Sequence, residues 1–382
     1  MNKDFKMVVM KERILVIFGG KSVEHDISII TAMQVLKQLP KSLDCVPIYI
    51  DRVGLWWIAD NLFDIEIYSD FKKLAKKRKQ VTLILGEKVV AVKKGNKFVS
   101  QFEVETVLNC CHGNIGEDGA MQGVLKTCAI PTTSSGVTSS ALCMDKVFMK
   151  DVLKANDILS PKYVSFDRCT YSQTKEKVMK NVANKIEFPL IVKPANLGSS
   201  IGISVCHKES ELEKAIELAL MFDEKILIEK LVENLREFNC ACFFFKGRFF
   251  TSNVNEVRNK KEIYSFEDKY LSKKDGNQEV DKTLTKKVQS LTEKVYKLFD
   301  CKGIVRVDFL FEEKTEILYV NEINTIPGSL AFYLFKDITF KDLLISMLEE
   351  SKLDAEREKK LTVSFESDAL KIFENVSASL KK

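Results

Sequence analysis

The sequence predicts an α/β protein of several domains, and three observations carry that prediction. The chain has 382 residues, more than a single hydrophobic core usually serves. Near the N-terminus a β-rich run, a glycine turn and an amphipathic helical pattern follow one another, which is typical of α/β layers. Further along, two β-rich runs flank Lys246 and Gly247, and this arrangement predicts a hairpin in an antiparallel sheet.

The N-terminal part is expected to form a partly parallel α/β domain. RILVIF (13–18) is a continuous apolar run that ends at a pair of glycines. Residues 27–39 follow with apolar side chains at helical spacing. VPIYI (46–50) and TVLNCC (106–111) predict two more buried strands of the same sheet.

A second α/β unit is expected in the middle of the chain. It begins with one long helical pattern over residues 139–155. The strands PLIVKPA (189–195) and IGISV (201–205) follow, separated by a glycine-serine loop. A helix over 209–222 and a strand over 226–231 complete this unit.

A third unit is expected after the hairpin. It contains a helix over 284–299, the strands IVRVDFLF (304–311) and ILYVNEIN (317–324), and the helix FKDLLISMLEE (340–350). Residues 258–283 are polar and lack a clear period, so they predict a long loop, and loops of that length usually act as lids.

The expected domains are therefore 1–143, 144–232 and 233–382. Near the C-terminus, KLDAEREKK predicts a solvated charge run and SDALKIFENV a short helix that packs back on the protein. The sequence assigns no role to residues 353–382.

The composition excludes several classes of protein. Lys and Arg number 59 and Asp and Glu 54, so the net charge of +5 is too small and too mixed for a nucleic-acid face. No stretch reaches the roughly 18 to 20 apolar residues of a membrane span, and the N-terminus lacks the apolar core of a signal peptide. Ten cysteines at irregular spacings fit no zinc motif. A cytoplasmic protein with reduced thiols and no nucleic-acid or membrane partner is expected.

Charged side chains alternate with apolar ones along the last two predicted strands. Arg306 and Asp308 share one face of the first strand, and Glu322 and Asn324 share one face of the second. If the strands pair as a hairpin, Asp308 lies opposite Glu322 and Arg306 opposite Asn324. Two carboxylates and an amide oxygen are hard ligands suited to magnesium. The pattern alone fits a cross-strand salt bridge on a solvated face equally well.

Lysines and a flexible loop predict an anion site. Lys193 ends a β-rich run and is followed by NLGSSIG, where backbone N–H groups can converge on phosphate oxygens. Lys146 lies in a predicted helix and Lys269 in the long loop. The chain has no GxxxxGK[ST] motif and no GxGxxG turn after a strand, which excludes Walker-type and Rossmann-type phosphate sites. Any one of these lysines alone is more typical of a solvated surface charge.

Two glycine-rich loops hold two of the three histidines. GGKSVEHDIS contains His25 and HGNIGEDG contains His112, and each loop follows a predicted strand and precedes a helix. Ligands in open α/β sheets bind at the carboxyl ends of strands, whereas a lone histidine is usually structural, so both interpretations stay open. Glu117 and Asp118 also fit charge complementarity at the start of the next helix.

Taken together, these segments resemble the D-alanine–D-alanine ligase family of the ATP-grasp superfamily. The matching motifs run in family order over nearly the whole chain: FGGKSVEHDIS, HGNIGEDGAMQG, SSALCMDK, IVKPANLGSSIG, LIEKLVENLREFNCA, FEDKY and RVDF…VNEINTIPGS. The resemblance implies a three-domain ATP-grasp fold in which ATP lies between two β-sheets of the central and C-terminal domains. It also implies that the carboxylate of one D-alanine takes the γ-phosphoryl group of ATP, and that a second D-alanine attacks the acyl phosphate, which supplies a peptidoglycan precursor.

The resemblance also implies roles for individual residues in nucleotide and metal binding. Asp308, Glu322 and Asn324 match the ligands of Mg²⁺ or Mn²⁺. The positions that match ATP contacts are Lys146, Lys193, Ser200, Glu229, Lys230, Glu237 and Lys269.

Further residues match the substrate and catalytic positions of the family. Glu24 resembles the carboxylate that holds the ammonium of the first D-alanine, and in the family it joins a hydrogen-bonded set with the residues that match Ser199 and Tyr270, which closes the mobile loop. His112 is expected beside the reacting carboxylate. Arg306 and the backbone N–H of Gly328 are expected to stabilise the tetrahedral oxyanion.

The sequence departs from the family pattern in two places. Thr132 stands where many relatives have an aromatic residue, and SLAFYLFKD after NTIPG lacks the serine-leucine pair that many relatives use for the second carboxylate. Ser329, Tyr333 and Leu334 are candidates for that role by proximity.

The alternatives therefore concern the second substrate and the presence of catalysis. D-serine or D-lactate competes with D-alanine as second substrate, although Tyr270 favours a dipeptide because depsipeptide-forming relatives commonly carry phenylalanine there. A non-catalytic nucleotide-binding regulator is disfavoured by the intact set of site residues. A homodimer is implied by the family alone.

Overall fold

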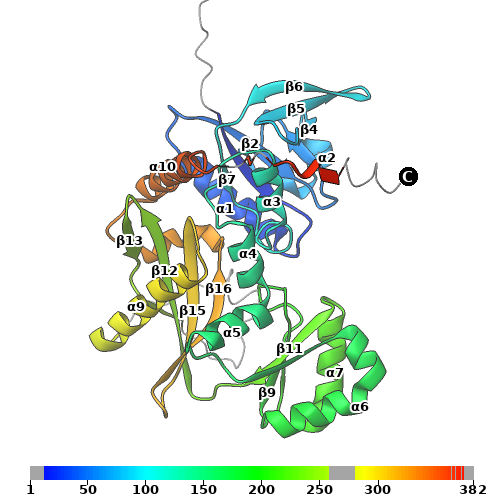
Figure 1. Ribbon diagram of the computed structural model, residues 1–382, viewed down its shortest axis with the longest axis vertical. Helices are drawn as coiled ribbons and strands as arrows, with labels where there is room; N and C mark the ends of the chain where they lie inside the picture. The colour runs from blue at the N-terminus through cyan, green and yellow to red at the C-terminus, as the bar shows by residue number, and fades with distance from the viewer. Residues whose placement is uncertain (1–12, 258–279, 363, 366, 371, 374–382) are drawn as a thin grey trace, which may run out of the picture.

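The computed structural model describes residues 13–257, 280–362, 364–365, 367–370 and 372–373. These residues form three β-sheets with helices packed on them (Figure 1). Most of the predicted lid loop, including Lys269 and Tyr270, lies outside the described residues. The expected domain boundaries at 143/144 and 232/233 stay predictions.

The N-terminal sheet has seven strands in the order β6-β5-β4-β3-β2-β1-β7. Its parallel part consists of β1 (Arg13–Gly19), β2 (Asp44–Ile50) and β7 (Thr106–Asn109). An antiparallel extension consists of β3 (Trp56–Ile58), β4 (Lys79–Leu83), β5 (Val89–Lys94) and β6 (Lys97–Glu103). The prediction of a partly parallel sheet is confirmed. The strand β1 is buried on both faces, which explains its continuous apolar run.

Helices cover both faces of this sheet. The helix α1 (His25–Gln38) packs with Val16 and Phe18 on one face, and α3 (Ala120–Thr127) packs with Leu15 and Ile17 on the other. The turn from β1 into α1 requires glycine, because a Cβ on Gly19 would lie 2.2 Å from the carbonyl oxygen of Ile50. The remaining elements of this region are η1 (Ile65–Ser69), α2 (Phe71–Leu74) and α4 (Val137–Met144).

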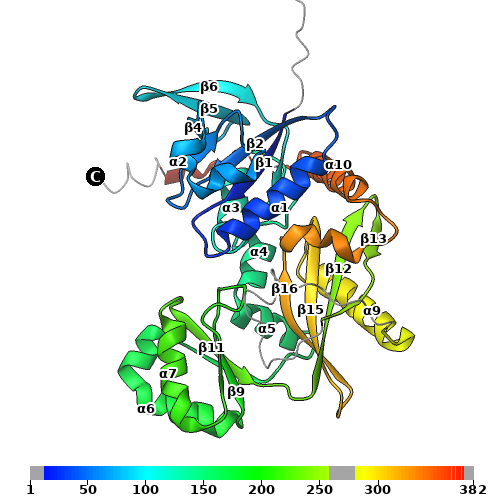
Figure 2. The same ribbon diagram turned by 180° about the vertical axis from the view of Figure 1, so that it is seen from behind.

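The central sheet is antiparallel, in the order β10-β9-β11-β8. Its strands are β8 (Tyr163–Asp167), β9 (Leu190–Pro194), β10 (Ser204–Cys206) and β11 (Lys225–Lys230). The helices α6 (Arg168–Lys185) and α7 (Glu209–Leu220) bury one face of the sheet. The other face meets α5 (Lys146–Ala155), which lies between the central and C-terminal sheets (Figures 1 and 2).

The prediction of one helix over 139–155 is wrong, because the chain breaks at Asp145. Asp145 has an extended backbone, and its carboxylate accepts hydrogen bonds from the backbone N–H groups of Val147 and Phe148. The Asp145 side chain thus caps the N-terminus of α5, and α4 ends at the preceding residue, Met144. Hydrophobic periodicity alone does not report such a break, because it depends on one capping side chain.

The C-terminal sheet has the order β13-β12-β15-β16, with β14 paired to β12. Its strands are β12 (Leu235–Phe245), β13 (Arg248–Thr251), β14 (Asn255–Val257), β15 (Ile304–Glu312) and β16 (Ile317–Asn324). The predicted hairpin around Lys246 and Gly247 is confirmed as β12 and β13. The helix α9 (Lys282–Leu298) packs on this sheet, and η2 (Gly328–Leu334) and α10 (Phe340–Glu358) follow β16.

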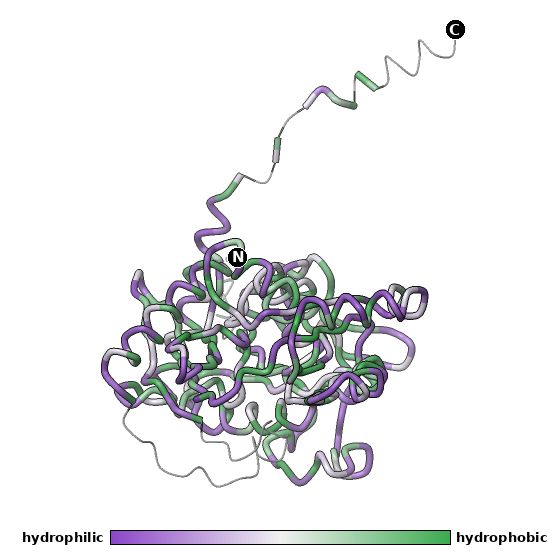
Figure 3. The backbone as a smooth tube through the Cα atoms, turned by 90° about the horizontal axis from the view of Figure 1, so that it is seen from below, coloured by the Kyte–Doolittle hydropathy of each residue, from purple (hydrophilic) through white to green (hydrophobic). Residues whose placement is uncertain are grey.

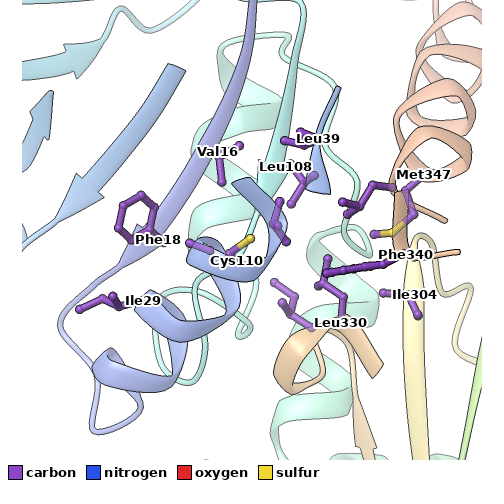
Figure 4. Close-up of a cluster of buried hydrophobic side chains, with 14 of the residues drawn as sticks. Val16, Phe18, Ile29, Leu39, Leu108, Cys110, Ile304, Leu330, Phe340 and Met347 are labelled. Atoms are coloured by element: carbon purple, nitrogen blue, oxygen red, sulfur yellow. The ribbon is translucent and has the colours of Figure 1, made fainter. Parts of the chain in front are cut away.

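The N-terminal and C-terminal parts share one hydrophobic core. Val16, Phe18 and Leu108 of the first sheet belong to the same buried cluster as Leu330 of η2 and Met347 of α10 (Figure 4). In Figure 2 the helix α1 lies beside η2, and the two elements are in contact. Burial of these apolar side chains fixes the two parts against each other.

The described residues beyond α10 leave the body of the protein (Figure 3). Leu370 is 80% exposed and Phe373 70% exposed, so these side chains do not pack back as expected from SDALKIFENV. In the part of the chain that the structure describes, no helix is both long and apolar enough to span a bilayer. The ten cysteines are all free thiols.

The contact at Gly303 yields a test of the domain arrangement. A Cβ on Gly303 would lie 1.8 Å from the carbonyl oxygen of Thr133, whereas Gly95 has a similar positive φ and open space around it. We expect Gly95→Ala to cost about 1 kcal/mol of unfolding free energy from backbone strain alone. Gly303→Ala should cost about 3 kcal/mol or more, because the backbone at Thr133 must move. Urea unfolding measures both variants, and equal midpoints for the two would contradict this packing.

Candidate active site

A polar cleft opens where the three sheets approach one another. The cleft is open to solvent and narrow, with a free volume of about 60 Å³. Its walls include residues from loops of the N-terminal part, from the loop after β9, and from β15 and β16: Glu24, Glu117, Ser199, Arg306, Glu322 and Asn324.

The strands β15 and β16 pair in the register predicted from the sequence. Asp308 lies opposite Glu322 and Arg306 opposite Asn324, with an irregularity directly after Asp308. The Arg306 guanidinium donates to both carboxylate oxygens of Asp308, at 2.7 and 2.8 Å. The Asn324 side-chain amide donates to the same carboxylate at 3.1 Å. The salt bridge between Arg306 and Asp308 therefore runs along one strand.

Asn239 on β12 is a neighbour of this group that sequence reasoning missed. It lies opposite Asp308 in the sheet, and its side-chain amide donates to the Asp308 carboxylate. The register of β12 against β15 was not predicted, so nothing in the sequence pattern placed Asn239 in the same row. Three donors thus hold Asp308 in one orientation.

The donor set fits a hard divalent cation. Asp308 and Glu322 are neighbours on one face of the sheet, their side chains are 18% and 21% exposed, and Asn324 adds an amide oxygen. Among the described residues, no group of three or more His, Cys, Asp and Glu side chains is arranged to hold a metal ion. The present set differs because its third oxygen comes from an amide, and oxygen-only ligands are those that Mg²⁺ prefers.

Lys146 joins the start of α5 to this face. Its ammonium donates to the carbonyl oxygen of Leu197 at 2.7 Å and lies 3.1 Å from a carboxylate oxygen of Glu322. Lys146 is buried, so its charge acts within the cleft rather than on a solvated surface. The predicted phosphate contact and one predicted metal ligand are therefore direct neighbours.

Lys193 belongs to a second cluster, built on Glu229. The side chains of Lys193 on β9 and Glu229 on β11 lie on the same face of the central sheet and form an ion pair. Lys150 of α5 lies 2.9 Å from the other oxygen of the Glu229 carboxylate. Two ammonium groups thus share one carboxylate in a site that excludes water.

Lys150 was missed by sequence reasoning, although the signal was present. It follows Lys146 by four residues, so both lysines lie on the same side of α5. Its side chain is fully buried, and burial lowers its pKa to about 8 despite the neighbouring Glu229. Burial also opposes ionisation of Glu229, but the charges of Lys150 and Lys193 outweigh it and lower the pKa of that carboxyl group.

Glu24 lies between two glycine loops. Its carboxylate accepts a hydrogen bond from the Ser199 hydroxyl. A Cβ on Gly113 would lie 2.7 Å from a Glu24 oxygen, and a Cβ on Gly198 would lie 2.9 Å from it, so glycine permits the close approach of both loops. Burial and the nearby Glu117 raise the pKa of Glu24, while the hydrogen bond from Ser199 opposes that rise.

The two loop histidines have different surroundings. His25 contacts the Gly20 carbonyl oxygen at 2.7 Å and the Tyr49 hydroxyl at 3.1 Å, and burial lowers its pKa, so it is a structural residue of the first loop. His112 instead lies 2.8 Å from the Thr31 hydroxyl oxygen and 4.0 Å from a carboxylate oxygen of Glu117.

The two acids of HGNIGEDG also differ. Asp118 accepts from the backbone N–H of Ala120, in agreement with a role at the start of α3. Glu117 lines the cleft and accepts from the backbone N–H groups of Gly113 at 2.7 Å and Ile326 at 3.0 Å. The interpretation as helix charge complementarity therefore holds for Asp118 only.

The other predicted residues that the structure describes have the following surroundings. Lys230 donates to the carbonyl oxygen of Phe188 at 3.1 Å, Ser200 has a left-handed backbone with φ of 58°, and Glu237 lies in β12 opposite Val257. Tyr333 lies with its hydroxyl 3.5 Å from the Arg306 guanidinium. Thr132 lines a separate cavity beside Thr133 and does not line the cleft.

Comparison with known proteins agrees with this architecture. Residues 13–135 match the family model described as D-ala D-ala ligase N-terminus, and residues 152–349 match the one described as D-ala D-ala ligase C-terminus. The D-alanine–D-alanine ligase of Thermosipho melanesiensis is 38% identical over 371 residues, which cover 94% of this chain and 98% of that protein.

Solved structures of related proteins have the same fold. The D-alanine-D-alanine ligase from Coxiella burnetii superposes with a TM-score of 0.76 at 25% identity and covers 92% of this chain and 96% of its own. The VanG D-Ala:D-Ser ligase from Enterococcus faecalis superposes with a TM-score of 0.75 at 26% identity over 89% of this chain and 99% of its own. The three-sheet arrangement is thus the ATP-grasp fold, and the chain belongs to the D-alanine–D-alanine ligase family.

Proposed function

We propose that this protein joins two D-alanines to D-alanyl-D-alanine at the expense of ATP, through an acyl phosphate, and so supplies a peptidoglycan precursor in the cytoplasm. One observation carries the proposal: Lys146 touches Glu322 in the same cleft that Glu24, Ser199 and Arg306 line. Residues from all three parts of the fold thereby meet at one place, as a reaction of three substrates requires.

The charges of the cleft support a nucleotide at one end and an amino acid at the other. Lys150 and Lys193 do not line the cleft itself, but they share the carboxylate of Glu229 in the buried cluster between α5 and the central sheet. This cluster has an excess of positive charge that suits phosphate oxygens, and we take it as the nucleotide end of the site. Glu24 and Glu117 lie at the opposite end, where their mutual repulsion suits an ammonium group.

Nucleotide contacts are proposed on both sides of the cleft. Lys146 and Lys193 would neutralise phosphate charge, which limits phosphoryl transfer between two anions. Adenosine is proposed to bind beside Glu229 and Glu237, which match the adenosine-binding positions of the family. The same resemblance adds Ser200, Lys230 and, outside the described residues, Lys269.

A divalent cation, Mg²⁺ or Mn²⁺, would be held by Asp308, Glu322 and Asn324. When bound, such a cation supplies charge neutralisation to the β- and γ-phosphates. The Arg306 guanidinium and the Asn324 amide already orient the Asp308 carboxylate toward one position. Because both oxygens of Asp308 accept from the Arg306 guanidinium, these donors would have to shift when the carboxylate binds a cation.

The first D-alanine is proposed to bind in the pocket between the two glycine loops. Its ammonium would pair with Glu24, which Ser199 already orients, and its carboxylate would face His112. A buried carboxylate with a raised pKa gains most from such a cationic partner. Tyr270, outside the described residues, is proposed to complete this set when the loop closes and excludes water from the acyl phosphate.

The second step would use Arg306 and the start of η2. Attack by the amine of the second D-alanine creates a tetrahedral oxyanion, for which Arg306 and the backbone N–H of Gly328 are the proposed donors. Ser329 and Tyr333 follow in the same segment, and the hydroxyl of Tyr333 lies beside Arg306. They are the proposed contacts of the second substrate.

A D-serine or D-lactate ligase is the second candidate, because the segment after NTIPG departs from the usual pattern at the second-substrate side. The structural likeness to a D-Ala:D-Ser ligase keeps this candidate in view. A homodimer rests on the family alone.

The proposed reaction is tested by ADP formation with Mg²⁺, ATP and D-alanine as the only amino acid, followed by mass spectrometry of the product. We expect D-alanyl-D-alanine as the product, and competing D-serine or D-lactate should not displace it. Turnover that appears only with a competitor present would favour the second candidate. Nucleotide binding without ADP formation for any D-amino acid would contradict catalysis altogether.

Arg306→Ala should separate catalysis from nucleotide binding. Removal of an oxyanion donor is expected to lower kcat roughly 100- to 1,000-fold, with little change in the KM for ATP. Arg168→Ala is a matched control, because Arg168 forms an exposed ion pair with Glu224 on the central part. Steady-state kinetics measures both variants, and an unchanged kcat for Arg306→Ala would remove this residue from the reaction.

Lys150→Met should show whether the buried lysine supports nucleotide binding. Breaking one side of a buried ion pair is expected to cost about 3 kcal/mol of unfolding free energy. Lys193 then remains as the only cation on Glu229, so ADP should bind more weakly. Lys154→Met is the control, since Lys154 lies one turn further along α5 and is exposed. Calorimetry measures the stability of both variants and their affinity for ADP. Equal stability and equal affinity in the two variants would reject this role for Lys150.

A further inference from the structure

We infer that Thr31 is a positioning residue for the second half of the reaction: its hydroxyl holds the backbone of the TIPGS segment (325–329) at the start of η2. The inference rests on the proposed function, because that function assigns the N–H of Gly328 to the oxyanion. Thr31 lies in α1, almost 300 residues away in sequence, and touches this segment directly.

The start of η2 has a backbone conformation that needs support from outside. Ser329, Leu330 and Ala331 have φ angles of 53°, 48° and 48°, so three successive residues other than glycine adopt the left-handed region. Such conformations are costly and persist only where the surroundings determine them. Leu330 and Ala331 are buried in the core shared with the N-terminal part (Figure 4).

Two polar side chains of the N-terminal part hold this segment on both sides of Gly328. The backbone N–H of Ser329 donates to the Thr31 hydroxyl oxygen at 3.1 Å. The backbone N–H of Ile326 donates to a carboxylate oxygen of Glu117 at 3.0 Å. The proposed oxyanion donor thus lies between two anchored positions, and its direction depends on both anchors.

Both anchors also contact His112. The Thr31 hydroxyl oxygen lies 2.8 Å from Nε2 of His112, and Glu117 lies 4.0 Å from Nδ1. The Thr31 oxygen accepts from Ser329, and its second lone pair and its own proton allow it to accept from Nε2 or to donate to it, according to the tautomer of His112. One hydroxyl therefore joins the first-substrate pocket to the segment that serves the second substrate.

Thr31 is fully buried, and its role differs from that of an ordinary core residue. Thr31→Val keeps the shape of the side chain but removes the acceptor for Ser329 and the partner of His112. A buried N–H without an acceptor is unfavourable, so the start of η2 should lose its fixed position. Thr31→Ser keeps the hydroxyl and should retain the anchor.

The first experiment does not depend on activity. Amide hydrogen exchange in the ligand-free protein, measured for the peptide that covers residues 326–331, should be about tenfold faster in Thr31→Val than in the parent protein. Thr31→Ser and the control Thr82→Val, whose hydroxyl bonds Leu83 in β4, should exchange as the parent does. Equal exchange in Thr31→Val and the parent would overturn the anchor.

The second experiment measures kinetics in the same variants. Thr31→Val should raise the KM for the D-alanine that supplies the amine and lower kcat, each about tenfold, while the KM for ATP stays within about twofold. Thr31→Ser should restore the parent values. An equal rise in the KM for ATP, or a failure of Thr31→Ser to restore, would reduce Thr31 to a structural residue. If the parent protein itself formed no ADP, the proposed function would fail while the exchange result still tested the anchor.

Discussion

The electrostatic asymmetry of the site is the constraint on which the rest of it depends. Lys150 and Lys193 surround the Glu229 carboxylate in a buried cluster at the proposed nucleotide end, whereas Glu24 and Glu117 line the cleft at the other end. Ionised groups in a low-dielectric interior are unfavourable unless they are paired, so each end is stabilised by a ligand of the opposite charge. Packing of α5 between two sheets and the approach of two glycine loops serve to bring these charges to fixed positions.

Different scales of the fold supply the parts of the site. Strand alternation places Arg306, Asp308, Glu322 and Asn324 on one face, and this requires only local pairing. The pocket around Glu24 requires instead that loops from separate domains approach within contact distance, which the glycines allow. Backbone register determines the positions of the first group of side chains, and tertiary packing determines those of the second. Substitutions in the first group therefore affect the strand pair, and substitutions in the second affect the approach of the loops.

The sequence predicted the strand face and its register because the period of two is visible in RVDFLF and VNEIN. Sequence patterns did not predict features that depend on a side-chain helix cap or on a contact between residues far apart in the chain. The break at Asp145 depends on one carboxylate that accepts two backbone N–H groups. Thr31 has its partner almost 300 residues away, and no local pattern records such a contact. Lys150 could have been found from its spacing to Lys146, but its burial depends on how α5 packs.

The helix α5 also determines which part of the molecule is easiest to displace. Val147, Ala195 and Leu227 form a small buried apolar cluster between α5 and the central sheet, whereas the N-terminal and C-terminal parts share a much larger core. Exposure of apolar area is unfavourable in proportion to that area. Displacement of the sheet of β8 to β11 would therefore expose less apolar surface than separation of the other two parts.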